Sequence, residues 1–271
     1  MDVYGIDGKV ARSIELPRVF SESFRKELVL RAILAEQSLR YQPKGRNLMA
    51  GLRTTATYVG NYKSYRTGRH MGIAIRPREK LGGGAMGYVR RIPSSVKGRR
   101  AHAQKVEKRL IESINSKEYI LALKSAIGGF SDSALVKSSR NFEGRKLPIV
   151  VDNKIESVAK TKELISILQA LGIGADLEKS HKPKTKGDMR SKQKRRSYRN
   201  SAIIIIKNAE KIGKAGRNIP GVDVCSIDKL TVEKLSPGGA PRISIWSEDA
   251  VKGVEEAVSK ASFKRLSSDK I

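Results

Sequence analysis

Hydrophobic residues recur along this chain at two spacings that predict different secondary structures. Apolar positions three or four residues apart, as between Leu28 and Leu39, are typical of helices with a buried face. Short continuous aliphatic runs, of which Ala202 to Ile206 is the longest, are typical of strands covered on both faces. By these patterns we expect helices at 22–39, 106–114, 116–127, 161–171 and 247–258, and strands at 147–151, 202–206, 222–225 and 243–246.

Turn and cap residues refine these boundaries. An Asp7-Gly8 pair between two short apolar runs predicts a β-hairpin over residues 3–14, because both central positions of its turn tolerate positive φ. Gly128-Gly129 is expected to end the helix before it. The residues expected to cap helix N-termini are Ser21, Ser116, Thr161 and Ser247.

Strand and helix candidates alternate along the second half of the chain. This alternation is typical of βαβ units, in which parallel strands form a sheet with helices on its faces. The first helix and the later elements are each too small to bury their own apolar faces. The sequence therefore predicts one α/β domain over residues 1–271, with a mainly parallel sheet flanked by helices and an extended loop inserted at 41–104.

The inserted segment is strongly basic. Residues 40–105 carry sixteen Lys and Arg side chains against one carboxylate, Glu79, with ten glycines and five tyrosines among them. Without apolar periodicity this run cannot form a core, and its charges repel one another. A polyanion would order it, because glycines allow close backbone approach, arginines offer forked donors to phosphates, and tyrosines stack on bases. The alternative is a disordered cationic linker.

A second basic patch precedes the strand expected at 202–206. Between residues 182 and 199 it holds nine cations and one acid, Asp188. This excess favours phosphate contact over a solvated loop, the alternative interpretation. We name residues 180–200 the second basic loop.

Bulk composition supports a nucleic-acid partner. The 271 residues carry a net charge of +28 and a pI near 10.3. The aliphatic runs are far too short to span a bilayer, and the N-terminal residues lack a signal-peptide pattern, so we expect no membrane partner. The one cysteine, Cys225, excludes an intramolecular disulfide and indicates a reducing compartment. These observations predict a cytoplasmic protein.

One glycine-rich stretch, Gly82 to Val89, fits the dinucleotide fingerprint and the kinase glycine-rich loop. The dinucleotide motif needs a strand before the glycines and a helix after them, and neither flank supplies the required element. The kinase motif also needs a lysine strand, a catalytic-loop aspartate and a metal-binding aspartate motif, and the sequence has none of these. His70, His102 and His181 have no partner at metal-ligand spacing. We therefore expect no enzymatic activity, no cofactor and no metal.

Five short motifs lie in order along the basic run: Asn47 to Thr54, Thr67-Gly68-Arg69, Arg76-Pro77-Arg78, Arg90 to Pro93 and Gly98 to His102. Together they resemble the universal L-four family of large-subunit ribosomal proteins. The later stretches, Arg217 to Val222 and Leu235 to Gly239, are similar to its archaeal branch, whereas Thr55 to Tyr65 matches no motif of the family.

The resemblance implies an α/β domain on the surface of the large subunit and a long loop that threads into ribosomal RNA. It also implies a role in early subunit assembly, ribosomal-protein neighbours, a loop tip lining the nascent-peptide exit tunnel, and no homo-oligomer. By counting, the loop folds back near residue 72, which places Arg66, Thr67, Gly68, Arg69, His70 and Met71 at that tip. The residues expected to bind ribosomal RNA are Lys44, Arg46, Arg53, Lys63, Arg76, Arg78, Arg90, Arg91, Lys97, Arg99, Arg100, His102, Lys105, Arg190, Lys192, Lys194, Arg195, Arg196 and Arg199.

Two other functions are compatible with the same sequence features. A free-standing RNA-binding regulator could act on messenger RNA through the same basic surface. A degenerate α/β enzyme with a basic arm would instead show a pocket that holds an acid or base with a perturbed pKa.

Overall fold

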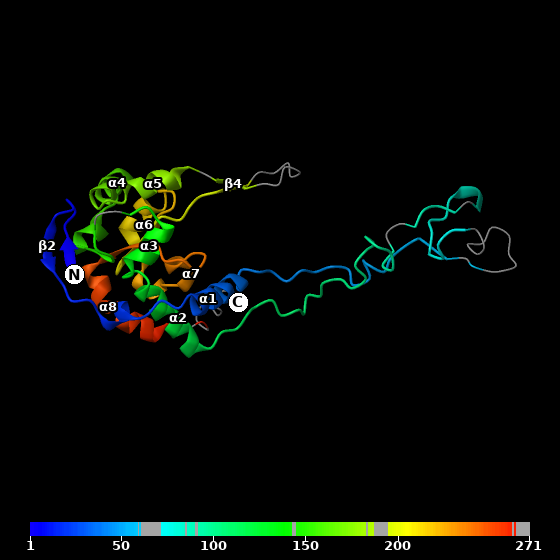
Figure 1. The fold of residues 1–271 in the computed structure, drawn as a ribbon, viewed down its shortest axis with the longest axis horizontal. Coiled ribbons are helices and arrows are strands. Elements are labelled where there is room, and N and C mark those ends of the chain that lie inside the picture. Colours follow the sequence, from blue (N-terminus) through cyan, green and yellow to red (C-terminus); the bar gives the residue numbers. More distant parts are fainter. Residues whose placement is uncertain are drawn as a thin grey trace. The chain divides into compact units, whose positions relative to one another are not determined.

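The computed structural model describes residues 1–58, 60, 72–84, 86–89, 92–142, 145–182, 184–186, 195–261 and 263. The chain divides into two compact units (Figure 1). The globular unit comprises Met1–Arg40 and Ile111–Ile271, and the loop unit comprises Tyr41–Leu110. The loop expected at 41–104 falls within the loop unit.

A six-stranded sheet forms the centre of the globular unit, in the order β2-β1-β3-β8-β6-β7. Only β2 runs antiparallel to its neighbour, and the other adjacent pairs are parallel. This arrangement confirms the predicted fold class, a mainly parallel α/β sheet. The strands are β1 (Asp2–Tyr4), β2 (Val10–Ser13), β3 (Ile149–Val151), β6 (Ala202–Ile206), β7 (Asp223–Ser226) and β8 (Ile243–Ser247).

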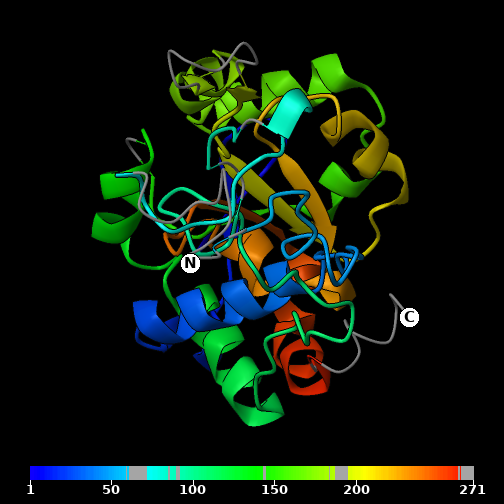
Figure 2. The same cartoon turned by 90° about the vertical axis from the view of Figure 1, so that its right-hand side faces the viewer.

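Helices cover both faces of this sheet (Figure 2). On one face α1, α2, α7 and α8 pack together, and on the other α4, α5 and α6 bury their apolar sides. The α-helices are α1 (Lys26–Ser38), α2 (Ser116–Gly128), α3 (Ser133–Ser139), α4 (Thr161–Ala170), α5 (Gly174–His181), α6 (Glu210–Gly216), α7 (Val232–Leu235) and α8 (Glu248–Lys260). Short 3₁₀ turns lie at Arg18–Ser21, Gly82–Gly84, Asn153–Ser157 and Ile227–Lys229.

Several sequence-based boundaries agree with the structure. Ser247 caps α8 by accepting a hydrogen bond from the amide of Ala250, and α2 ends at Gly128 as expected. The predicted hairpin forms from β1 and β2. The strands expected at 147–151, 202–206, 222–225 and 243–246 also form, as β3, β6, β7 and β8, with ends that differ by at most two residues.

Other boundaries were wrong. No helix forms at 106–114, where Val106 at the start of the expected stripe is exposed and only Ile114 at its end is buried in the core. The first helix begins at Lys26 rather than near residue 22, and Ser21 belongs to the preceding 3₁₀ turn. Thr161 is the first residue of α4 and makes no capping hydrogen bond. Asn115 rather than Ser116 occupies the cap position of α2.

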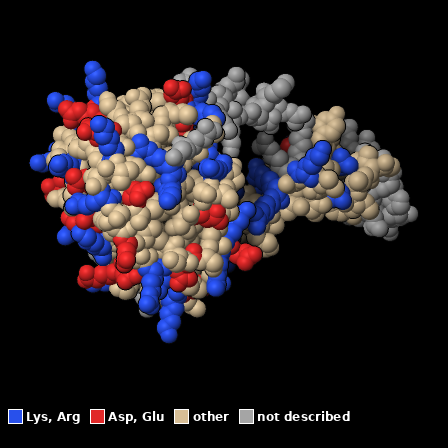
Figure 3. Space-filling view, turned by 60° about the vertical axis from the view of Figure 1, so that its left-hand side comes forward, with Lys and Arg blue, Asp and Glu red and all other residues tan. Residues whose placement is uncertain are grey.

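Acidic and basic side chains are intermixed on the face of the globular unit that Figure 3 shows. This mixture is typical of a solvated protein surface. Among the described residues, no helix combines the length and the apolar composition needed to cross a membrane.

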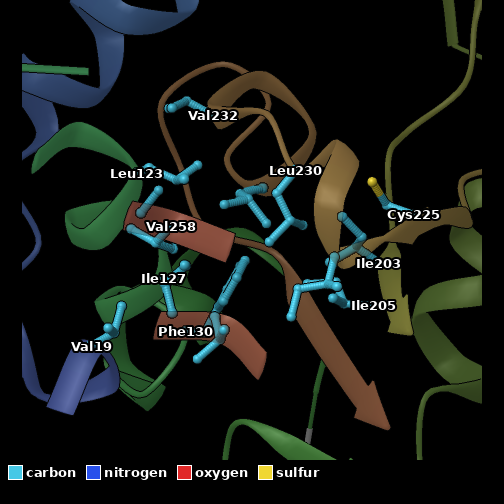
Figure 4. Packing of buried hydrophobic residues seen from close by; sticks show 14 of the residues in the cluster. Val19, Leu123, Ile127, Phe130, Ile203, Ile205, Cys225, Leu230, Val232 and Val258 are labelled. Atoms are coloured by element: carbon cyan, nitrogen blue, oxygen red, sulfur yellow. The ribbon is translucent and has the colours of Figure 1, made fainter. Parts of the chain in front are cut away.

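The core consists of two hydrophobic clusters, one on each face of the sheet. Ile203 and Ile205 of β6 belong to one cluster, and Ile204 of the same strand belongs to the other, as the alternation of a strand requires. Trp246 is fully buried, and the ring of Phe20 packs edge-on against it at a centroid distance of 5.1 Å. Figure 4 shows side chains from α2, β6 and α8 gathered in the first cluster. Both clusters therefore lie within the globular unit, whereas Ile92 of the loop unit is buried outside them.

Candidate nucleic-acid interface

The loop unit holds most of the candidate RNA-binding residues. Its described residues carry twelve Lys and Arg side chains and two carboxylates, Glu79 and Glu107. This imbalance gives the loop unit the electrostatic character of a polyanion-binding segment.

The two arms of the loop unit meet near Gly51. The turn at Asn47–Arg53 lies against the backbone at Arg100 and Ala101, and a Cβ at position 51 would overlap the Arg100 carbonyl oxygen and lie 2.7 Å from that of Ala101. Only glycine permits this approach. Arg99 fixes the contact, because its Nη1 donates to the carbonyl of Arg53 at 2.9 Å.

Farther along the arms, Thr57 and Arg78 form an antiparallel bridge, with both N–O distances at 3.1 Å. A second hairpin follows, in which Lys80 pairs with Met86 around the turn Gly82–Gly84. Gly83 takes a φ of 69° there, which explains the glycines as turn formers. Around them the described residues form this hairpin and not the strand–turn–helix that a dinucleotide site requires.

The candidate residues of the loop unit differ in their hydrogen bonds to the loop's own backbone and in their exposure. Arg76 donates to the carbonyl of Ser94, and Arg78 donates to that of Ala74 at 3.2 Å, so both guanidinium groups also stabilise the loop's own backbone. Exposed side chains belong to Lys44, Arg46, Arg53, Lys97, Arg99, Arg100, His102 and Lys105. Lys63, Arg90, Arg91 and the expected tip residues 66–71 lie outside the described residues.

Four of these candidates line one cavity of about 490 Å³ between the arms: Arg46, Arg99, Arg100 and His102. The sequence indicated the three arginines by their charge and His102 by its place in the motif Gly98 to His102. It gave no sign that the four come together, because the cavity depends on the backbone contact at Gly51.

The second basic loop contains a two-stranded antiparallel ribbon. Strand β4 (Lys184–Lys186) pairs with β5 (Arg195–Ser197), which includes the candidates Arg195 and Arg196. Three further candidates in this loop, Arg190, Lys192 and Lys194, lie outside the described residues.

Arg199, at the base of this ribbon, binds the protein itself. Its Nη2 lies 3.3 Å from Oδ1 of Asp176, a fully buried carboxylate, and also donates to the carbonyl of Ser139. Asp176 further accepts hydrogen bonds from the Ser201 hydroxyl at 2.5 Å and the Asn141 amide at 3.0 Å. Sequence reasoning missed Asp176, because it assigned no helix to the segment that contains it. Arg199 therefore anchors the ribbon to α5.

A second cavity, of about 380 Å³, lies on the globular unit and is lined in part by Glu36, Arg40 and Asp223. Burial raises the pKa of Glu36, although hydrogen bonds from Tyr119 and the Val232 amide oppose the shift. Both carboxylate oxygens accept hydrogen bonds from protein donors, including the first two amides of α7. This geometry is that of a helix-capping carboxylate, not of a general acid or base.

Within the described residues, no group of three His, Cys, Asp or Glu side chains could hold a metal ion. Cys225 is buried, and burial raises the pKa of its thiol, although the nearby Lys234 opposes the shift. A raised pKa keeps the thiol protonated and unreactive at neutral pH.

The sequence pattern of the ribosomal protein L4/L1 family matches residues 14–257 of this chain, which span both units. The chain is 40% identical over 251 residues to the large ribosomal subunit protein uL4 of Methanospirillum hungatei, covering 92% of this chain and 96% of that protein. It is 39% identical to the protein of the same name from Archaeoglobus fulgidus, and 36% identical to that from Methanocaldococcus jannaschii. Each of these two alignments covers 94% of this chain and 97% of the relative.

Proposed function

Because the chain belongs to the ribosomal protein L4/L1 family, we propose that it is a structural protein of the large ribosomal subunit that binds ribosomal RNA. The observation that carries this proposal is the extent of the match, which includes the basic loop unit as well as the globular unit. A ribosomal role places the protein in the cytoplasm, with ribosomal proteins as neighbours. No catalytic step is assigned to it.

The loop unit supplies the binding chemistry. Its cations neutralise RNA phosphates and release condensed counterions, which gives affinity without base specificity. The globular unit contributes the second basic loop and anchors its base through the pair of Arg199 and Asp176.

The tip of the loop, residues 66–71, is proposed to line the nascent-peptide exit tunnel. The antiparallel bridge between Thr57 and Arg78 supports a reversal of the chain between these two residues. The proposal for the tip otherwise rests on the family, because those residues lie outside the described ones.

Sedimentation tests the proposed function. A tagged copy of the full chain, expressed in place of the native gene, is expected to sediment with large subunits in equal molar amount and to remain there at high salt. A free-standing regulator of messenger RNA would stay near the top of the gradient or leave the subunits as salt rises. That result would overturn the ribosomal assignment.

A further inference from the structure

The cavity between the arms of the loop unit has the composition of an anion site. Three arginines, Arg46, Arg99 and Arg100, line it together with His102, and none of the described lining residues is acidic. Its volume of about 490 Å³ is much larger than a phosphate group needs and lies in the range of pockets that enclose small organic molecules.

One wall of this cavity is fixed in place. The Nη1 of Arg99 donates to two carbonyl oxygens of the opposite arm, that of Arg53 at 2.9 Å and that of Ala50 at 3.5 Å. A guanidinium group held in this way presents a flat face, on which a nucleobase can stack at little entropic cost. Gly51 closes the same wall by its contact with the backbone of Arg100.

We propose that this cavity receives one unpaired RNA nucleotide. The base stacks on the guanidinium of Arg99, and Arg46 and Arg100 contact the flanking phosphates. His102 and Gln104 offer hydrogen-bonding groups to the edge of the base. The inference rests on the proposed function, since RNA must supply the nucleotide, and it adds that this part of the loop reads an extruded base as well as charge.

A cavity of this kind would distinguish unpaired from paired nucleotides. A nucleotide inside a duplex is stacked between its neighbours and cannot enter a cavity, whereas a bulged nucleotide can be splayed out. A surface that only neutralises phosphates would bind a paired and a bulged stem about equally well.

The test uses the full-length protein and two fluorescently labelled RNA hairpins that differ only in a single bulged nucleotide. The wild-type protein is expected to bind the bulged hairpin about tenfold more tightly, the effect of stacking one base. Arg99→Lys keeps the charge but loses the planar face, so it should abolish this preference while still binding the paired hairpin. Gly51→Ala, which forces the arms apart, should have the same effect.

Lys44→Ala provides the control, because Lys44 is an exposed cation on the arm that carries Gly51 and lies outside the cavity lining. It should weaken binding of both hairpins by the same factor and leave their ratio unchanged. An unchanged preference in both Arg99→Lys and Gly51→Ala would overturn the nucleotide site, as would equal wild-type affinity for the two hairpins. Either result leaves the proposed function intact, whereas a wild-type protein that binds neither hairpin contradicts that function itself.

Discussion

The hydroxyl of Tyr119 in α2 donates a hydrogen bond of 2.7 Å to Oε1 of Glu36 in α1. The same oxygen accepts from the amide of Val232, and the other carboxylate oxygen accepts from the amide of Glu233, both at 2.8 Å. These amides open α7 and have no partner within that helix. One buried carboxylate therefore joins three helices on one face of the sheet.

Removing the Tyr119 hydroxyl is expected to destabilise the globular unit. Tyr119→Phe keeps the ring, which packs against Phe263, but deletes a hydrogen bond to a charged group and should lower the free energy of unfolding by about 2 kcal/mol. Urea denaturation of the two proteins measures this difference. Tyr198→Phe, at an exposed position, is the control, and an equal effect of both substitutions would contradict the structural role of Tyr119.

Burial also gives Glu36 a predictable pH dependence. Desolvation raises the pKa of Glu36 in the folded state. Between the ordinary pKa of glutamate and this raised pKa, the folded protein therefore binds more protons than the unfolded chain. The contribution of Glu36 to stability is therefore present below the ordinary pKa of glutamate and declines as pH rises through the folded-state pKa.

Glu36→Gln should lack this decline, since an amide does not titrate. The difference in unfolding free energy, wild type minus variant, is expected to fall as pH rises from the ordinary glutamate pKa, as urea titrations at a series of pH values would show. Glu163→Gln, on the exposed side of α4, should not produce this trend. A difference that grows with pH would show that burial does not raise the pKa of Glu36.

The sequence predicted best those elements whose own residues show a clear hydrophobic pattern. Strand β6 matches the aliphatic run at 202–206 residue for residue, because such a run is stable only when covered on both faces. Helix α3 has too few apolar residues to show a helical period, although Asp132, which caps it, was a usable signal.

Contacts between distant segments account for most of what the sequence could not predict. The ion pair of Arg40 with Glu233 joins residues 193 positions apart, and no local pattern encodes it. The same holds for the candidate interface: its cations were evident from composition, but the hydrogen bonds of Arg99 that shape the cavity cross from one arm to the other.

The buried carboxylate of Asp176 is expected to stabilise the protein and to hold the base of the second basic loop in place. Asp176→Ala removes the ion pair with Arg199 and leaves the Ser201 hydroxyl and Asn141 amide without their acceptor. The loss in unfolding free energy should reach about 3 kcal/mol, the usual cost of breaking a buried pair. Urea denaturation measures it, with Lys182→Ala at an exposed site near the ribbon as the control. Equal stability of the two variants would argue against the anchoring role.

The globular unit is expected to fold without the loop unit. The hydroxyl of Ser38 accepts a hydrogen bond from the amide of Glu112 at 3.0 Å, so the chain returns to the globular unit close to where it leaves. Replacing residues 41–110 with a short Gly/Ser linker therefore needs no rearrangement, and a shorter loop costs slightly less closure entropy. Circular dichroism should show a single cooperative thermal transition with little change in midpoint. A broad, non-cooperative melt would mean that the loop unit contributes to the fold.

The arms and the tip of the loop are expected to differ in what their substitutions impair. Arg46 and Arg100 lie on the described arms, where we propose that each contacts phosphate, so alanine at either position should reduce large-subunit assembly. Arg69 and His70 belong to the proposed tip, one side of which we expect to face the aqueous tunnel. Alanine there should leave assembly nearly normal and change nascent-chain stalling instead. Gradient profiles and a stalling reporter on the four variants separate these outcomes, and equal assembly defects in both pairs would make the tip one more RNA anchor.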